Sequence, residues 1–353
     1  MKKRLKCGGS LPNSNHNPFK TFSMKNHNLI DAIAPRLTEL MIQRIEHLET
    51  DWQKPWITDL AHGLPRNLRG TPYRAGNILM LLFLSEIVGY QTPIFMTFRQ
   101  AKEEGLNILK GSLSFPVYFW KICIRHKETR RKIDLEVYRQ LPKEAHKQYE
   151  VIPIIRYYSV FNLDQTDMQE KQPERYAALT ARAERKDYSD GMVCEPIDRM
   201  VEQQSWLCPI ELRYGDRAYY TRLHDRVVCP LKEQFPKGEA FYGTLLHEIA
   251  HSTGHAERLN RTMGTSFGDE EYAREELVAE LTSALCGAMA GFATTPREEN
   301  AAYLKGWLTQ LRREPAYLFD ILVDVNRAAR LIFDHLETGA DEIVEEETEV
   351  PAA

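Results

Sequence analysis

The chain has 353 residues, of which 43% are hydrophobic and 27% are charged. This composition is typical of a folded, soluble protein and excludes a fibrous or wholly disordered chain. No apolar run approaches the length of a membrane span, and the six cysteines form no CxxC pair, which argues against a membrane protein, a disulfide framework and a cysteine zinc cluster.

The net charge of −4 conceals two halves of opposite sign. Residues 1–160 contain 25 Lys plus Arg against 14 Asp plus Glu, a balance of +11, whereas residues 161–353 contain 21 against 36, a balance of −15. Two parts with different partners are the simplest explanation. A basic half attracts phosphates, and an acidic half repels them.

The amino terminus is polar and basic. Residues 1–28 contain six Lys or Arg and no acid, so we expect a disordered basic leader. Its positive start resembles that of a signal peptide, but no apolar core follows it, and we therefore expect a cytoplasmic location.

Hydrophobic periodicity predicts the elements that follow. Apolar residues at helical spacing predict an amphipathic helix over 30–48, and a nearly continuous apolar dozen predicts a buried helix over 77–88. Residues 98–104 suggest a short helix. Runs of β-branched and aromatic residues predict strands over 114–124 and 151–163, and the charged segment 127–149 between them is expected to be an inserted hairpin or loop.

These elements predict an α+β protein of two domains. The first is a mixed α/β module, and the second is mainly helical after Phe241. A stretch rich in charge and poor in large apolar groups separates them. The expected boundaries are 29–163 for the first domain, 164–190 for the linker, 191–336 for the second domain and 337–353 for an acidic disordered tail.

The segment from Leu245 to His255, LLHEIAHSTGH, has the spacing of a zinc hydrolase. His247 and His251 are four residues apart, so on a helix they project from one face and can bind a single metal ion. Glu248 stands beside the first histidine, where its carboxylate can act as a general base toward water at a bound zinc. We therefore predict one Zn²⁺ per chain, with Glu248 as the catalytic residue.

A catalytic zinc normally has three protein ligands, so a third is required. On an unbroken helix His255 lies about 12 Å along the axis from His247, and one ion cannot bind both. The acidic helix expected over 272–286 offers Glu276 as the third ligand and Glu280, one turn later, as the partner of a ligand histidine. The alternatives that stay open are Glu271, Glu275 and His255 as the third ligand, and His255, Tyr242 and Tyr272 as partners of the transition state.

The basic half places aromatic residues among cations. Single-stranded nucleic acid is bound by stacking on aromatic rings and by cations that follow the phosphates. The composition fits such binding, but aromatic residues near a basic rim also line ordinary cores. The candidates for DNA contact include Trp52, Trp56, Arg69, Tyr73, Arg74 and Lys110.

Two ordered sets of motifs resemble one known family, the ArdC antirestriction proteins, over about residues 30–285. Its single-stranded DNA binding domain is similar to WQKPW (52–56), LPRNLRGTPYRAGN (64–77), GYQTPIFMTFRQAKEEG (89–105) and LKGSLSFPVYFW (109–120). Its zincin-like metallopeptidase domain is similar to HEIAHSTGHAERLNR (247–261) and YAREELVAEL (272–281). The resemblance therefore supports a single-stranded DNA binding module joined to a mainly helical, zincin-like (HExxH) metallopeptidase domain.

The resemblance implies a protein of plasmids or integrative elements that binds single-stranded DNA and protects incoming DNA from restriction. A protein substrate, such as a restriction component, is a further expected partner. Two alternatives remain: a cytoplasmic zinc metallopeptidase whose basic domain recruits protein substrates, and a DNA-binding protein with a purely structural zinc site. The oligomeric state stays open. By matching position the resemblance places Trp56, Asn67, Tyr73, Arg74, Asn77, Thr97 and Gln100 in the DNA-domain motifs, and His247, Glu248, His251 and Glu276 in the metal site.

Overall fold

The structure is a computed structural model. It describes residues 29–50, 55–57, 63–73, 76–134, 137–138, 141–181, 192–264, 270–296 and 303–337. The expected basic leader, the acidic tail beyond Glu337 and the second part of the expected linker, from residue 182 on, lie outside these ranges. Within them, no helix combines the length and the apolar character that crossing a membrane requires.

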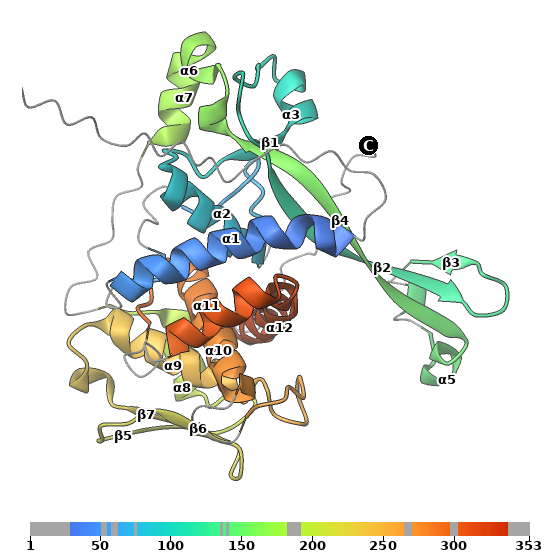
Figure 1. Cartoon of the computed structure of the whole chain (residues 1–353). Coiled ribbons are helices and arrows are strands. Elements are labelled where there is room, and N and C mark those ends of the chain that lie inside the picture. Colours follow the sequence, from blue (N-terminus) through green and yellow to red (C-terminus); the bar gives the residue numbers. More distant parts are fainter. Residues whose placement is uncertain are drawn as a thin grey trace, which may run out of the picture.

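Helix α1 (Leu29–Thr50) lies across the middle of the molecule and packs on helices from the other end of the chain (Figure 1). Its apolar stripe, which includes the fully buried Leu37 and Met41, faces α11 (Leu304–Arg313) and α12 (Tyr317–Glu337). One continuous hydrophobic core therefore contains residues from both halves of the sequence.

Helix α2 (Gly76–Val88) is the buried helix expected from the apolar dozen, and all its residues from Gly76 to Leu84 are buried. It contacts α1, α12 and α10 (Glu270–Met289). Its first residue must be glycine, because a Cβ there would lie 2.3 Å from the Tyr118 hydroxyl. The Gly76 backbone N–H also donates to Asn326 Oδ1 on α12 at 2.6 Å, which ties the two halves together.

An antiparallel sheet with strand order β1-β4-β2-β3 forms the rest of the amino-terminal half. Its long pair, the two strands predicted from the sequence, is in register from Phe115↔Val160 to His126↔Tyr149. The distal end of this pair, with β3 and α5, projects away from the helical body (Figure 1). The elements are β1 (Phe95–Thr97), α3 (Phe98–Glu103), β2 (Phe115–His126), β3 (Lys132–Ile133), α5 (Lys143–His146) and β4 (Tyr149–Asn162).

The segment expected to begin the interdomain linker is folded. Residues 163–180 form a 3-10 helix, η1 (Leu163–Gln165), and two short helices, α6 (Met168–Lys171) and α7 (Pro173–Thr180). Met168 is fully buried in a second small core with Ile94, Met96, Ala101, Leu106 and Leu163. The low apolar content hid this because a few scattered apolar residues, Met168, Tyr176 and Leu179, anchor the segment instead of a periodic stripe.

A three-stranded sheet with order β5-β7-β6 and a layer of helices form the carboxy-terminal half. Strand β7 pairs in parallel with β5 and antiparallel with β6, and helix α9 contacts both β7 and α10. The elements are α8 (Glu195–Glu202), β5 (Ile210–Arg213), β6 (Tyr219–Thr221), β7 (Arg226–Pro230), η2 (Lys232–Gln234) and α9 (Gly238–Ser252).

Candidate metal centre

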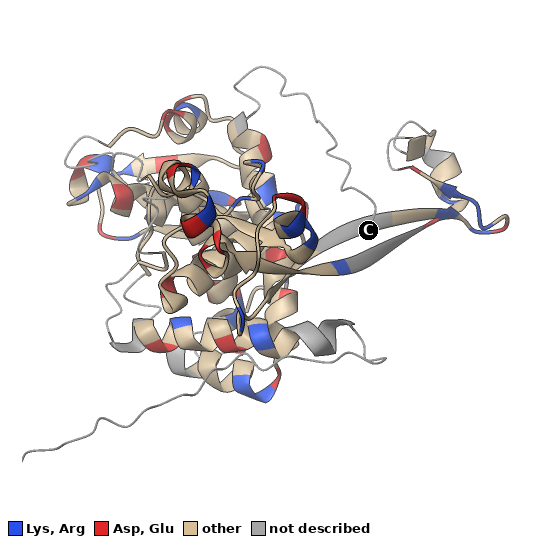
Figure 2. Cartoon of the chain, turned by 90° about the horizontal axis from the view of Figure 1, so that it is seen from above, with Lys and Arg blue, Asp and Glu red and all other residues tan. Residues whose placement is uncertain are grey.

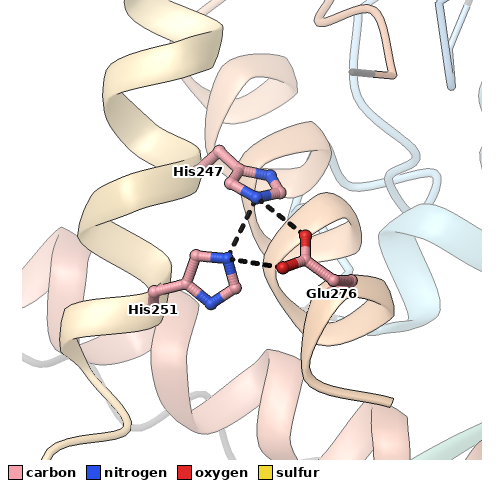
Figure 3. A group of neighbouring side chains, drawn as sticks. All are labelled: His247, His251 and Glu276. Carbon is pink, nitrogen blue, oxygen red and sulfur yellow. Dashed lines mark hydrogen bonds and ion pairs between the residues drawn. The ribbon is translucent and has the colours of Figure 1, made fainter. Parts of the chain in front are cut away.

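Three side chains from two packed helices face one another at the centre of the carboxy-terminal half (Figure 3). His247 and His251 lie on α9, and Glu276 lies on α10. The two Nε2 atoms are 3.1 Å apart, and the Glu276 oxygens lie 3.4 Å from that of His247 and 3.5 Å from that of His251. Metal bonds of about 2.0–2.1 Å at tetrahedral angles set ligand atoms about 3.3 Å apart. The three side chains therefore fit a tetrahedral metal ion that keeps a fourth position for another ligand.

A second carboxylate faces the other ring nitrogen of each histidine. Glu275 Oε1 lies 3.2 Å from His251 Nδ1, and Glu280 Oε1 lies 3.7 Å from His247 Nδ1. A hydrogen-bonded carboxylate fixes the tautomer and orientation of a metal-binding imidazole, as Glu275 does for His251. Glu280 lies beyond hydrogen-bond distance of His247 Nδ1. From the sequence, Glu280 was expected in this role and Glu275 was a competing ligand. The structure places Glu275 behind His251 and outside the group of three.

The charges around His251 prepare the centre for a cation. Burial alone would lower the pKa of His251, but the negative charges of Glu276 and Glu275 outweigh it and raise the pKa to about 10. Burial likewise opposes ionisation of Glu276, yet the positive charge of His251 and the hydrogen bond from His247 hold its pKa well below the usual range.

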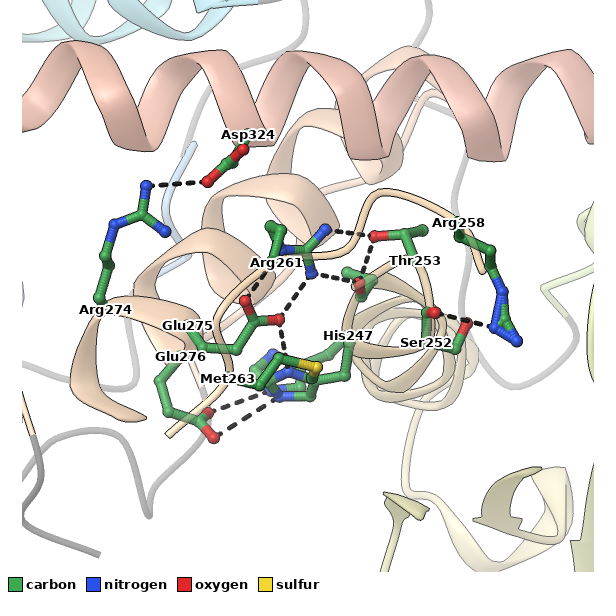
Figure 4. Close-up of polar contacts among 12 residues, drawn as sticks. His247, Ser252, Thr253, Arg258, Arg261, Met263, Arg274, Glu275, Glu276 and Asp324 are labelled. Atoms are coloured by element: carbon green, nitrogen blue, oxygen red, sulfur yellow. Dashed lines mark hydrogen bonds and ion pairs between the residues drawn. The ribbon is translucent and has the colours of Figure 1, made fainter. Parts of the chain in front are cut away.

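Arg261 holds the Glu275 carboxylate in place (Figure 4). Its guanidinium donates to both Glu275 oxygens, at 2.9 and 2.6 Å, and also to Thr253 Oγ1 and the Ala250 carbonyl. Burial works against the ionised form of Glu275, but the hydrogen bonds from Arg261 and His251 prevail and lower its pKa. This buried ion pair was not foreseen from the sequence.

The chain must turn back after α9 for Arg261 to reach Glu275. Helix α9 ends at Ser252, and Gly254 lets the returning chain approach, because a Cβ at that position would lie 2.9 Å from Met263 Sδ and 3.0 Å from an Arg261 guanidinium nitrogen. The same turn carries His255 away from the group of three, so His255 is not brought to the metal centre. Its Nδ1 instead accepts a hydrogen bond from the Glu257 backbone N–H at 3.3 Å.

The remaining candidates of the metal half take different places. Glu248 is buried, with 2% of its surface exposed, and its charge acts on His251. Tyr272 is half-buried with its ring 5.8 Å from that of Tyr303, and Glu271 is exposed. The Tyr242 hydroxyl donates to Asp198 at 2.6 Å, so its hydrogen bond is directed at α8.

Trp56, predicted to contact DNA, is instead part of the metal centre's surroundings. It is fully buried, and its indole N–H donates to Glu280 Oε2 at 2.9 Å. Its backbone N–H donates to the Thr294 carbonyl, so the segment around it is docked on the carboxy-terminal half. A buried ring cannot stack on a base, and the prediction of DNA contact for Trp56 is wrong for this structure. The motif match identified the residue but not the face on which it lies.

Other DNA-motif residues also have structural contacts. Asn77 is buried and bonds the Tyr118 backbone N–H and carbonyl, and the Tyr73 hydroxyl donates to the Phe95 carbonyl. Thr97 and Gln100 form the capping box of α3, and Asn67 Oδ1 accepts two backbone N–H groups of its own turn. These contacts make Asn77 unavailable to DNA, whereas Arg69 and Lys110 are exposed. Trp52 and Arg74 lie outside the described residues.

Removing the Trp56 N–H tests its link to the metal centre. Trp56→Phe keeps most of the buried ring but leaves Glu280 without this donor, so we expect metal affinity to fall by about tenfold, the lower end of the range for residues behind a ligand. Competition with a chromophoric chelator measures the effect. Trp307→Phe is the matched control, because its buried indole donates to a backbone carbonyl, that of Ala273. Equal metal affinities in the two variants would contradict the link.

A small cavity lies beside His247 and Glu280, between α9, α10 and the segment Thr295–Pro296. Its volume is about 90 Å³. Sites for small molecules reach roughly 300 Å³ or more, so this cavity cannot hold a peptide.

Comparison with known proteins agrees with this geometry. Residues 31–161 match the family described as the N-terminal domain of anti-restriction factor ArdC, and residues 197–321 match the family described as zincin-like metallopeptidase. Two solved structures of antirestriction protein ArdC from the R388 plasmid are similar to this chain. The metal-free structure has a TM-score of 0.62 at 26% identity and covers 88% of this chain and 99% of its own, and the Mn(II)-bound structure has 0.60 at 25%, with 88% and 98%.

Relatives are also found by sequence. Two Escherichia coli proteins named DNA primase TraC are 30% and 29% identical over 301 and 305 residues, 82% and 83% of this chain. The chain spans only 19% and 26% of their length. The uncharacterized protein y4eC of Sinorhizobium fredii is 30% identical over 293 residues, 81% of this chain and 87% of its own.

Fold and site together define a two-domain α+β protein with a zincin-like domain, as the sequence predicted. The three side chains on α9 and α10 are a group that could hold a divalent metal ion. The chain belongs to the ArdC-type family of antirestriction proteins.

Proposed function

We propose that this chain is an antirestriction protein of a mobile genetic element that binds single-stranded DNA and carries a gluzincin-like zinc metallopeptidase centre. The observation that carries the peptidase part is the ligand set itself: His247, His251 and Glu276 at tetrahedral spacing, with a carboxylate behind each histidine. The cytoplasmic location and the protection of incoming DNA from restriction, expected from the sequence, belong to the same proposal.

Zinc is the ion we propose for this centre. Two imidazoles and one carboxylate are a common ligand set of catalytic zinc, which keeps a fourth position for water or substrate. Harder ions such as Mg²⁺ prefer oxygen ligands only. The Mn(II)-bound relative supports a divalent ion in this fold, and metal analysis of the purified chain decides which ion it holds.

The residues around the centre have separate tasks in peptide hydrolysis. A bound zinc ion supplies Lewis-acid polarisation of a carbonyl and lowers the pKa of water. Glu248, next to the first ligand on α9, accepts the proton from water and passes it to the leaving amine. Glu275 holds the His251 imidazole in the tautomer that leaves Nε2 for the ion, and the Glu280 carboxylate faces Nδ1 of His247 at 3.7 Å.

The DNA part of the proposal depends on the amino-terminal half. Its residues match the N-terminal domain of the ArdC family, and residues 1–160 have a charge balance of +11. Two relatives are named as DNA primases, proteins that act on DNA. The exposed cations Arg69 and Lys110 are the predicted contacts that the described surface leaves available.

A structural role of the metal is the competing function, and the burial of the centre favours it. His247 and Glu248 are each 2% exposed, Glu276 is 7% exposed and His251 is 9% exposed. A peptide would need the side chains around Glu248 to open before its carbonyl could approach.

Glu248→Gln separates the two functions. The change keeps the size of the side chain but removes the general base, so hydrolysis of a fluorescent casein is expected to fall by at least about 100-fold. Protection of an unmethylated plasmid entering a restricting strain should be lost with it, while metal content and melting temperature persist. Glu257→Gln, at an exposed position just beyond α9, is the matched control. Full protection by Glu248→Gln would instead leave the metal with a structural role.

A further inference from the structure

The projecting end of the β2–β4 pair is the most isolated part of the described structure (Figure 1). Near the body, Val117 and Tyr118 of β2 are buried in the main core. The pair then continues to His126↔Tyr149. The nine residues from Tyr118 to His126 correspond to about 30 Å of extended strand, so the described far end, within residues 123–149, projects beyond the buried part of the pair (Figure 1). We call residues 123–149 the basic arm.

The end of the basic arm has a small packing unit of its own. The rings of Tyr138 and His146 stack at 4.2 Å, and Tyr149 meets both Tyr138 and His126 edge to face. Ile124 is buried there with only 1% of its surface exposed. These contacts give the arm a fixed shape, so its surface charges have fixed positions.

Cations dominate the surface of the basic arm. Residues 125–132, RHKETRRK, contain five Lys or Arg and one Glu, and Figure 2 shows them gathered at the far end. Arg125 and Arg130 share the Glu150 carboxylate, at 2.8 and 3.1 Å, and the hydrogen bond from Arg125 is the main cause of its lowered pKa. The cations at 127, 131 and 132 are exposed, and no described carboxylate forms an ion pair with them.

Several exposed cations on the body are paired with carboxylates. Arg99 pairs with Glu103, and Arg175 pairs with Glu104. On the other side, Arg312 pairs with Glu46. Paired surface charges cancel at a distance, whereas five cations beside two carboxylates, Glu128 and Glu150, leave a local positive field. The arm therefore presents concentrated positive charge on a chain whose net charge is −4.

We propose that the basic arm binds the phosphate backbone of single-stranded DNA through Lys127, Arg131 and Lys132. This inference rests on the proposed DNA-binding function and names the surface that performs it, in place of the buried Trp56 and Asn77. The half-buried stacked rings of Tyr138 and His146 lie on the same arm, and aromatic rings beside cations are the combination that recognises unpaired strands.

Binding of a labelled oligothymidylate by the full chain at several salt concentrations tests the proposal. The triple variant Lys127→Ala, Arg131→Ala, Lys132→Ala loses three phosphate contacts, so the slope of log affinity against log salt should decrease in magnitude by about 2. At the lowest salt the dissociation constant should rise by roughly tenfold or more. A matched variant, Arg217→Ala, Lys237→Ala, Arg327→Ala, removes the same charge from exposed positions elsewhere and should bind almost as the wild type does.

The outcomes distinguish failure of the arm proposal from failure of the DNA-binding function on which it rests. If the wild type binds the strand and the arm variant shows the same slope as the body variant, the arm proposal is wrong while the DNA-binding function stands. A wild type that fails to bind at low salt removes both. If the arm variant loses binding to a DNA duplex but still binds the single strand normally, the arm proposal is also wrong. An unchanged melting temperature in the arm variant shows that the fold is intact.

Discussion

Arg261→Met is expected to lower the free energy of unfolding by about 3–5 kcal/mol, the effect of removing one partner of a buried ion pair. Arg261 is 6% exposed and Glu275 is 3% exposed, and the guanidinium makes four hydrogen bonds. Methionine fills similar space but leaves the Glu275 carboxylate without its main counter-charge. Urea unfolding of the metal-loaded protein, followed by circular dichroism, measures the loss.

Two further variants show whether burial of the ion pair causes the loss of stability in Arg261→Met. Arg312→Met removes an arginine from the exposed pair with Glu46 and should cost less than about 1 kcal/mol. Arg261→Met combined with Glu275→Gln leaves no unpaired buried charge and should recover much of the lost stability. A single Arg261→Met variant as stable as Arg312→Met would show that this ion pair does not hold the returning chain against α10.

The parts of the metal centre that the sequence predicted are those fixed by local spacing. His247 and His251 share a face of α9 because they are one helical turn apart, and Glu276 and Glu280 do so on α10. Once each helix was predicted, only the docking of one helix on the other remained. Both helices are buried on all sides where they meet, α9 from Leu245 to Ser252 and α10 from Glu275 to Ala288. The buried helix over 77–88 was predictable because its pattern of apolar residues is also local in the sequence.

The parts that were not predicted depend on long-range contacts. Arg261 reaches Glu275 only because the chain turns at Gly254, and the sequence showed no pattern for that return. Trp56 is buried because its backbone binds Thr294, 238 residues further along the chain, so a motif in the basic half became part of the metal half. The strands β5, β6 and β7 are too short for alternation of side chains to identify them.

Removal of a ligand should have the other large effect. In His251→Ala the metal affinity is expected to fall by about 100- to 1000-fold, because 10–16 kcal/mol of binding shared among about four ligands is roughly 3–4 kcal/mol for each. Competition with a chromophoric chelator gives the affinity, and metal analysis gives the ion bound per chain. Added metal should raise the melting temperature of the wild type but barely that of the variant, since a ligand stabilises only the state that binds it.

His255→Ala is the matched control, because it makes the same change four residues later, beyond the turn at Gly254. The structure leaves His255 out of the group of three, so this variant should bind metal as tightly as the wild type. If His255→Ala lost the metal and Glu276→Gln kept it, the ion would be held by three histidines of one segment. The chain after α9 would then have to follow a different path in the metal-loaded protein. If instead Glu276→Gln loses the metal with His251→Ala, the ligands come from two helices, and metal binding must stabilise the packing of α9 on α10. The metal-induced shift in melting temperature then measures that packing directly.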